Sequence, residues 1–189
     1  DNFLFSLAVY QVYNESISEW INNQKLVIYD ITTPSNPVLQ SSTDIRDTSG
    51  SEFAITIENN LAYIAGQYEV NNNSKTYLKI FDITDTKNPI LEGSLDFTEG
   101  ESPSGGIAKV GDYLFIGSGW SGTLVANVSD STNPSYEKQV NFQNMKGMKI
   151  NGTITYVLTY NNLEIYDIST PLAPQMFKSI SIKENHNQR

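Results

Sequence analysis

Asp30-Ile31-Thr32-Thr33-Pro34-Ser35-Asn36-Pro37 is the stretch that decides the fold, because it recurs three more times along the chain. The later copies read Asp82-Ile83-Thr84-Asp85-Thr86-Lys87-Asn88-Pro89, Asn127-Val128-Ser129-Asp130-Ser131-Thr132-Asn133-Pro134 and Asp167-Ile168-Ser169-Thr170-Pro171-Leu172-Ala173-Pro174. Successive copies begin 52, 45 and 40 residues apart, at positions 30, 82, 127 and 167. This period is typical of propeller blades and similar arrays, in which each unit buries its faces against its neighbours.

The second copy predicts most clearly how strands are arranged around the repeated turn. Residues 53–57 alternate and are β-branched, and after Asn59-Asn60 the run 61–65 returns, which indicates a β-hairpin. A third strand at 77–81 leads into the turn, and a fourth at 90–97 follows it. The other copies repeat this order, and no stretch has a helical period of useful length. We therefore expect an all-β propeller of four-stranded antiparallel blades, at approximately residues 1–46, 47–98, 99–143 and 144–183, with a polar tail at 184–189.

The first copy is incomplete, because residues 3–9 align with the second strand of the other copies. The sequence therefore predicts fifteen strands and an unpaired edge along residues 3–9. An exposed edge of this kind favours pairing with another strand. We expect the four repeats to be part of a larger propeller, with the first blade completed by further blades or by another chain.

The strands before the turns carry a specific resemblance. Leu26-Val27-Ile28-Tyr29-Asp30-Ile31 and Leu163-Glu164-Ile165-Tyr166-Asp167-Ile168, each followed by Ser/Thr-x-Pro, resemble the LVIVD-repeat family. The hairpin strand at 61–66 is similar to the family's small-residue hairpin, whereas Ala126-Asn127-Val128 departs from its pattern. The resemblance implies a β-propeller of prokaryotic, largely surface-exposed type, a class mostly without an assigned biochemical activity.

Composition excludes several classes of function. A net charge of −9 disfavours nucleic acid and anionic membrane surfaces as partners, and no apolar run is long enough to insert into a membrane. The chain has no cysteine, and its single histidine, His186, lies in the polar tail, so thiolate sites and histidine triads are ruled out. We expect no cofactor and no metal.

The repeated carboxylates Asp30, Asp82 and Asp167 invite a metal or acid–base interpretation. The third copy has Asn127 at the same position, and an amide keeps the hydrogen-bond acceptor but lacks the charge. We therefore expect all four residues to cap the following turn by accepting from backbone N–H groups.

An aromatic column, Phe5, Tyr63, Phe115 and Tyr156, falls at matched positions on the second strands. Such a column could stack on sugars, but packing between neighbouring blades is the commoner role. We therefore interpret it as core.

Loop lengths carry the functional content. In an up-and-down blade, the connections after strands two and four share one face. Those after strand two vary widely here, at 11–24, 67–76, 118–122 and 160–162, and those after strand four are 46–52 and 98–106. Variable loops on a rigid scaffold are where binding usually resides. The residues predicted to contact a ligand are aromatic and acidic side chains of these connections: Tyr13, Trp20, Tyr68, Trp120, Tyr160, Glu69 and Glu101.

The function expected from these features is a non-enzymatic β-propeller module, extracellular or at a cell surface, that binds a protein or a glycan through its variable-loop face. Two alternatives remain open. One is a structural subunit of an extracellular assembly, completed by strand sharing. The other is a hydrolase or lyase that uses carboxylates or calcium near the central channel, although the expected innermost strands carry only Lys109 and Lys149 as charges.

Overall fold

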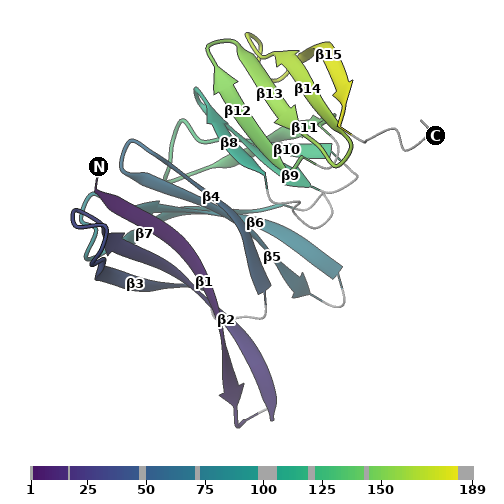
Figure 1. The fold of residues 1–189 in the computed structure, drawn as a ribbon. Helices are drawn as coiled ribbons and strands as arrows, with labels where there is room; N and C mark the ends of the chain where they lie inside the picture. The colour runs from purple at the N-terminus through teal and green to yellow at the C-terminus, as the bar shows by residue number, and fades with distance from the viewer. Residues whose placement is uncertain are drawn as a thin grey trace, which may run out of the picture. The chain divides into compact units, whose positions relative to one another are not determined.

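The structure, a computed structural model, describes residues 2–16, 18–46, 50–70, 73–97, 106–118, 122–142 and 145–182. Within these ranges the chain forms fifteen strands and no helix, as the sequence predicts (Figure 1). All strand pairs are antiparallel, and they make four separate sheets.

Each sheet contains one copy of the repeated turn, between its last two strands. The first sheet has the order β1 (Phe3–Asn14), β2 (Glu19–Asp30), β3 (Val38–Arg46). The second is β4 (Gly50–Glu58), β5 (Leu61–Val70), β6 (Asn73–Asp82), β7 (Ile90–Asp96). The third is β8 (Ile107–Val110), β9 (Tyr113–Ser118), β10 (Gly122–Asn127), β11 (Ser135–Val140). The fourth is β12 (Gly147–Asn151), β13 (Ile154–Leu158), β14 (Asn162–Asp167), β15 (Gln175–Ser181).

The sheets are grouped into two compact units. The first unit holds residues 1–99 with 131–134, and therefore the first two sheets. The second holds residues 100–130 with 135–189, and therefore the last two. These up-and-down sheets of three or four strands, repeated along the chain, are the blades of a β-propeller-type fold.

Strand β1 occupies the second-strand position, as the sequence predicts. Ile83 N donates to Asn60 O at 2.9 Å, which ties the turn of the second sheet to the residue just before β5. Ile31 N makes the same bond to Asn2 O, at 2.7 Å, just before β1. Among the described strands, β1 pairs only with β2, so it forms the edge of a three-stranded sheet, in agreement with the expected unpaired edge.

A β-bulge recurs at one position in all four sheets. The register between the last two strands shifts by one residue, so that one residue of the outer strand has no direct partner. This residue is the third after the final proline of each turn, and the four are Gln40, Glu92, Glu137 and Phe177. Bulges increase local twist, and the repetition gives each blade the same bend at the same place.

Each unit has an apolar core between its two sheets. In the first unit, the buried cluster contains Leu26, Ile28, Ile45, Ala62, Ile64, Tyr77, Phe81 and Ile83. In the second unit, it contains Phe115, Val125, Val140, Phe142, Met145, Val157, Tyr166 and Ile168. Burial of this apolar surface is the main favourable term that holds the paired sheets together.

Two of the predicted loops are strands instead. Strand β1 continues to Asn14 and β2 begins at Glu19, so the stretch 11–24 is mostly a two-stranded ribbon (Figure 1). Likewise β5 runs to Val70 and β6 begins at Asn73, so the stretch 67–76 is a hairpin. The prediction of loops was wrong because these stretches keep the register of the sheet and satisfy their backbone N–H and C=O groups by pairing.

Candidate functional site

The four turn residues share one local geometry. The backbone N–H groups of Thr32 and Thr84 donate to Asp30 Oδ1 and Asp82 Oδ1, both at 2.8 Å. Ser129 N donates to Asn127 Oδ1 at 3.0 Å, and Ser169 N donates to Asp167 Oδ1 at 2.7 Å. A side chain that accepts from the residue two positions on is an Asx-turn. The charge of the aspartates is therefore not needed for the geometry, because the amide of Asn127 reproduces it.

These bonds also favour the ionised form of the three carboxyls. Side-chain and backbone hydrogen bonds from Thr32 hold the pKa of Asp30 below its usual value, and Thr84 does the same for Asp82. The backbone N–H of Ser169 has the largest effect in lowering the pKa of Asp167. Hydrogen bonds to a carboxylate stabilise its charged form, so these acids are poor proton donors near neutral pH.

The predicted ligand residues Tyr13 and Trp20 lie directly opposite each other on the β1–β2 ribbon. The Tyr13 side chain is 46% exposed, whereas the side chain of Trp20 lies outside the described part of the chain. The ribbon is two-stranded beyond Gln24, because the pairing of β2 with β3 begins there, at Arg46. The structure thus brings this predicted pair together.

Tyr68 has a different place from the one predicted. It lies in β5, packs against the buried cluster of the first unit, and its ring centroid is 6.3 Å from that of Tyr77. The prediction of a loop aromatic was wrong, because the continuation of β5 carries Tyr68 along the edge of the core. The backbone of Glu69 follows in the same strand, and its side chain is outside the described part.

The other predicted residues are not brought to the ribbon by any described contact. Tyr160 lies in the short connection between β13 and β14 of the second unit and is 68% exposed. Trp120 and Glu101 lie outside the described residues.

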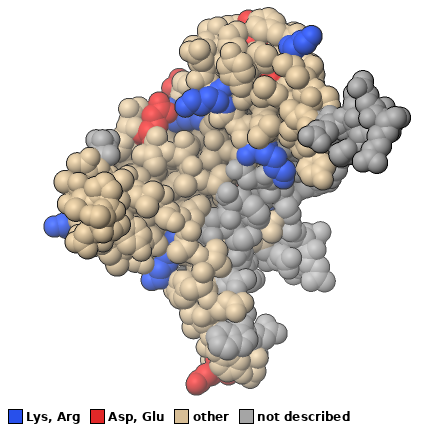
Figure 2. Space-filling view, viewed as in Figure 1, with Lys and Arg blue, Asp and Glu red and all other residues tan. Residues whose placement is uncertain are grey.

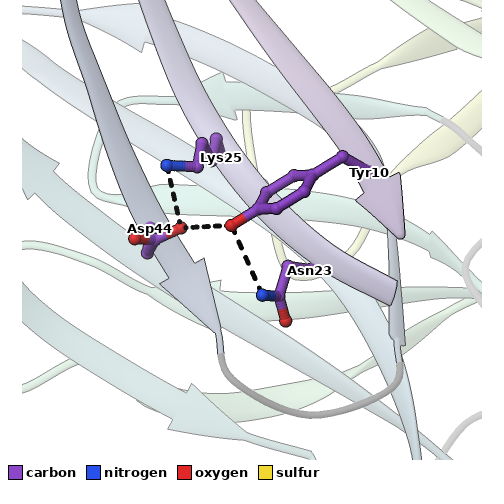
Figure 3. A network of polar contacts seen from close by, with 4 residues as sticks. All are labelled: Tyr10, Asn23, Lys25 and Asp44. Carbon is purple, nitrogen blue, oxygen red and sulfur yellow. Dashed lines mark hydrogen bonds and ion pairs between the residues drawn. The ribbon is translucent and has the colours of Figure 1, made fainter. Parts of the chain in front are cut away.

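A polar network at the base of the ribbon was not predicted from the sequence. Figure 3 shows Tyr10, Asn23, Lys25 and Asp44, contributed by β1, β2 and β3. The Tyr10 hydroxyl donates to Asp44 Oδ1 at 3.2 Å and accepts from Asn23 Nδ2 at 3.3 Å (Figure 3). The Lys25 ammonium lies 3.3 Å from Asp44 Oδ1 and 5.3 Å from the centre of the Tyr10 ring. The network fixes the side chain of Tyr10 on the ribbon, although exposed ion pairs add little to stability.

The network has a sequence signal, visible only once the register is known. Ala8 pairs with Lys25 and Lys25 pairs with Asp44, so the opposite charges stand side by side across two strands. Cross-strand neighbours of opposite charge stabilise a sheet, and Tyr10 lies two residues along on the same face.

The aromatic column is divided between buried and exposed positions. Phe115 is fully buried and Tyr63 is 2% exposed, as expected of core residues. Burial has the largest effect in raising the pKa of the Tyr63 hydroxyl, and the carboxylates of Glu58 and Glu92 raise it further. Phe5 is partly buried against the core of the first unit, but Tyr156 is 39% exposed. The core interpretation therefore fails at Tyr156.

A second candidate surface lies beside the short turns of the first unit. Its cavity, of about 370 Å³, is lined by Phe3, Phe5, Ile57, Glu58, Asn59, Asn60, Ile83, Thr84 and Thr86. Asn59 and Asn60 both have positive φ, 51° and 61°, as a tight hairpin turn requires. Aromatic walls with amide and hydroxyl groups at the rim could hold a small polar ligand.

Charged side chains are sparse on the face shown in Figure 2, and acidic atoms lie at the tip of the projecting ribbon. Glu15 is the exposed acid of the described turn residues there. Among the described residues, no group of three or more His, Asp or Glu side chains is arranged to hold a metal ion. The same residues include no helix that is long and apolar enough to cross a membrane.

Comparison with known proteins yields a match to one family model and to solved structures, two of which are the following. A family model described as LVIVD repeat matches residues 21–45 and 104–141, while no curated protein matches the chain. A functionally unknown protein from Desulfotomaculum acetoxidans is 13% identical, with a TM-score of 0.49 over 94% of this chain and 70% of that one. The computationally designed Ika8 protein is 11% identical, with a TM-score of 0.53 over 95% of this chain and 59% of that one.

The likeness to the designed protein concerns the fold alone, and this chain spans 59% of its length. The matched segments carry more information, because they contain the turns that begin at Asp30 and Asn127. The third repeat is therefore matched even though its Ala126-Asn127-Val128 departs from the expected pattern. The chain therefore contains two segments that match the LVIVD repeat, in agreement with the resemblance seen in its sequence.

Proposed function

We propose that the chain is a non-enzymatic recognition module, at a cell surface or outside the cell, that binds a protein or a glycan through the β1–β2 ribbon. The observation that carries the proposal is the exposure of apolar and aromatic side chains on both faces of β1. Val9 and Tyr13 are 53% and 46% exposed on one face, and Tyr10 and Val12 are 36% and 41% exposed on the other.

The ribbon differs from the rest of the first sheet because no third strand supports it beyond Gln24. A two-stranded hairpin is marginally stable in water, so its apolar side chains gain from being covered. Covering apolar surface contributes about 25 cal/mol per Å², and aromatic side chains add directional contacts to a partner. The ribbon therefore loses less conformational entropy on binding than a disordered loop would, because strand pairing has already fixed its backbone.

The chemistry of the ribbon fits two classes of partner. Tyr10 on one face of the ribbon and Tyr13 on the other could each stack on the apolar face of a sugar ring, while the carboxylates of Asp44 and Glu15 accept hydrogen bonds from sugar hydroxyls. The same groups would attract the ammonium and guanidinium groups of a basic protein segment. Salt separates the two, because screening weakens contacts with a basic segment more strongly than contacts with a neutral glycan.

The test is binding to a glycan array and to a set of basic peptides, followed by variants against each partner found. Tyr13→Ala is expected to raise the Kd by about 5-fold to 150-fold, which corresponds to about 1 to 3 kcal/mol at a central aromatic anchor. Ile90→Ala is the control, because Ile90 is 65% exposed on the outer strand of another sheet. A Kd that depends on Phe5 and Asn59 but not on Tyr13 would move the site to the cavity beside the short turns.

A further inference from the structure

The sequence contains one asparagine that is followed by glycine, and the structure places it at a hairpin turn. Asn151 is the last residue of β12 and pairs with Ile154, so Gly152 and Thr153 form the two-residue turn between β12 and β13. Gly152 has a φ of 62°, which glycine adopts without steric cost. Every other asparagine of the chain precedes a residue that carries a side chain.

The Asn151 side chain is not held by the fold. Asn151, Gly152 and Thr153 are all exposed. Neither the amide of Asn151 nor the N–H of Gly152 makes a hydrogen bond to another residue that the structure describes. Nothing lies within 4 Å of the position that a Cβ of Gly152 would take. The turn therefore has space, and access to water, on the side where the amide meets the next main-chain nitrogen.

Two asparagines of the repeated turns have the opposite surroundings. Oδ1 of Asn127 accepts from the backbone N–H of Ser129 at 3.0 Å and from its hydroxyl at 2.7 Å, and a β-branched valine follows Asn127. Nδ2 of Asn88 donates to Asp85 Oδ2 at 2.7 Å, and the proline that follows Asn88 has no N–H. These amides are held, and their following residues are hindered or lack the nitrogen proton.

The arrangement at Asn151 permits an intramolecular reaction. Hydroxide removes the proton of the Gly152 N–H, and the nitrogen forms a bond to Cγ of Asn151. The Cγ–Nδ2 bond then breaks, and the nitrogen leaves as ammonia with a proton from water, which restores the hydroxide. The product is a five-membered succinimide ring, and glycine hinders its closure least because it has no Cβ.

Water opens the succinimide ring in one of two ways. Breaking the new bond to Cγ gives aspartate, whereas breaking the original peptide bond gives isoaspartate, in which the main chain runs through Cγ. In total one water enters and one ammonia leaves, so no other reactant is needed.

We propose that Asn151 is a modification site of this chain, at which spontaneous deamidation produces aspartate and isoaspartate. Asparagine is a thermolabile residue, and here its sequence and its surroundings both favour the reaction. Pairing with Ile154 restrains the main chain of Asn151, so the reaction is slower in the folded chain than in a peptide of the same sequence. The proposal concerns a turn of the second unit and does not depend on recognition by the ribbon.

Isoaspartate should loosen the hairpin in which it forms. It inserts one carbon into the main chain between β12 and β13, where a two-residue turn sets the register. The carbonyl oxygen of Thr153 accepts from Ile168 N at 2.7 Å, which ties the hairpin to the repeated turn of the fourth sheet. A displaced turn weakens this bond. Aspartate keeps the length of the main chain and makes the net charge one unit more negative than −9.

Incubation of the folded chain at mildly alkaline pH, in water enriched in heavy oxygen, tests the proposal. Digestion with trypsin in ordinary water then releases residues 150–178 as one peptide, which also contains Asn161 and Asn162 as internal comparisons. We expect heavy oxygen at residue 151 in a measurable fraction of chains, within the time in which a synthetic peptide of residues 147–156 reacts completely. Asn161 and Asn162 should stay intact.

Asn151→Gln is the matched control, because its amide has one more methylene and would have to close a six-membered ring. It should take up no heavy oxygen at this position. Far-ultraviolet circular dichroism establishes that the variant is folded, and Asn151→Ser replaces it if it is not. An Asn151 that stays intact throughout, a reaction at Asn161 or Asn162 before Asn151, or equal uptake in the control would overturn the proposal.

Melting of the reacted protein tests the effect on the hairpin. Anion exchange separates the reacted chains, because they carry one more negative charge. These chains, a mixture of aspartate and isoaspartate, should have a lower Tm than the Asn151→Asp variant, which has the charge without the extra carbon. Equal Tm values would contradict the loosening of the turn by isoaspartate.

Discussion

The hydroxyl of Tyr77 donates a 3.0 Å hydrogen bond to Oε1 of Gln24, and both side chains are buried. The bond joins β6 of the second sheet to β2 of the first, inside the core of the first unit. Nε2 of Gln24 is buried without a hydrogen-bond partner among the described residues. The amide is therefore held through its oxygen, at the place where the ribbon leaves the three-stranded part of the sheet.

Removal of this hydroxyl should destabilise the protein. Tyr77→Phe leaves Oε1 of Gln24 without this donor in a buried site, and the expected cost is about 1 to 3 kcal/mol in urea unfolding. Gln24→Met removes the amide, and the double variant should recover part of the loss. Costs that simply add in the double variant would show that the bond contributes no coupling.

The turn caps should tolerate loss of charge but not loss of the acceptor. Asn127 accepts from the backbone N–H of Ser129 and, at 2.7 Å, from its hydroxyl. Asn127→Ala should therefore cost about 1 kcal/mol in urea unfolding. Asp82→Asn keeps an acceptor and should leave the Tm nearly unchanged at neutral pH. A metal-dependent rise in Tm that Asp82→Asn abolishes would contradict the capping role.

The same carboxylates should give the fold an acid limit. Their pKa values in the folded state lie below the ordinary value of 3.8, so the unfolded chain takes up protons first as the pH falls. Their contribution to the free energy of unfolding is complete above pH 3.8 and is lost as the pH falls through the lower folded values. The variant Asp30→Asn, Asp82→Asn, Asp167→Asn should have a shallower loss of stability below that pH. Identical acid unfolding curves for this variant and the wild type would refute the linkage.

Gly93 in β7 should be intolerant of any side chain. A Cβ there would collide with the backbone carbonyl oxygen of Ser131 and approach Pro134 Cδ to 3.0 Å. Gly93→Ala should therefore cost about 1 to 3 kcal/mol, the usual range for overpacking against an atom that cannot move freely. Gly147→Ala in β12 is the matched control, because nothing lies within 4 Å of its added Cβ. Equal free energies of unfolding for the two variants would mean that the turn at Ser131–Pro134 does not pack against β7 in solution.

The sequence predicted what depends on local interactions. The turn bonds join residues two positions apart, as from Thr84 to Asp82, so the repeat itself contains the information. The alignment of residues 3–9 with a second strand is confirmed, because the hydrogen bond from Ile31 N to Asn2 O repeats the one from Ile83 N to Asn60 O.

Features that depend on distant partners could not be predicted in this way. The ribbon forms because Tyr13 faces Trp20 across a register inherited from the sheet, and a polar stretch of variable length is also what a loop would show. Tyr68 was expected in an exposed loop and packs against the core, whereas Tyr156 was expected in the core and is exposed. The sequence does not show this, because burial depends on which sheet covers each face. The bulge residue always lies three positions after the last proline of the turn, as Gln40 does. This constant spacing can be recognised as a bulge only when the strand pairing is known.

Shortening the ribbon tests the central claim most directly. Tyr10 and Asn23 are paired, so residues 11–22 can be replaced by Asn-Gly, which closes a tight hairpin between them. We expect the shortened chain to keep a Tm close to that of the wild type and to lose at least about 10-fold in affinity for each glycan or peptide that the wild type binds. A shortened chain that is folded and binds those partners with unchanged Kd would contradict recognition by the ribbon. So would a wild type that binds no glycan or basic peptide of the set.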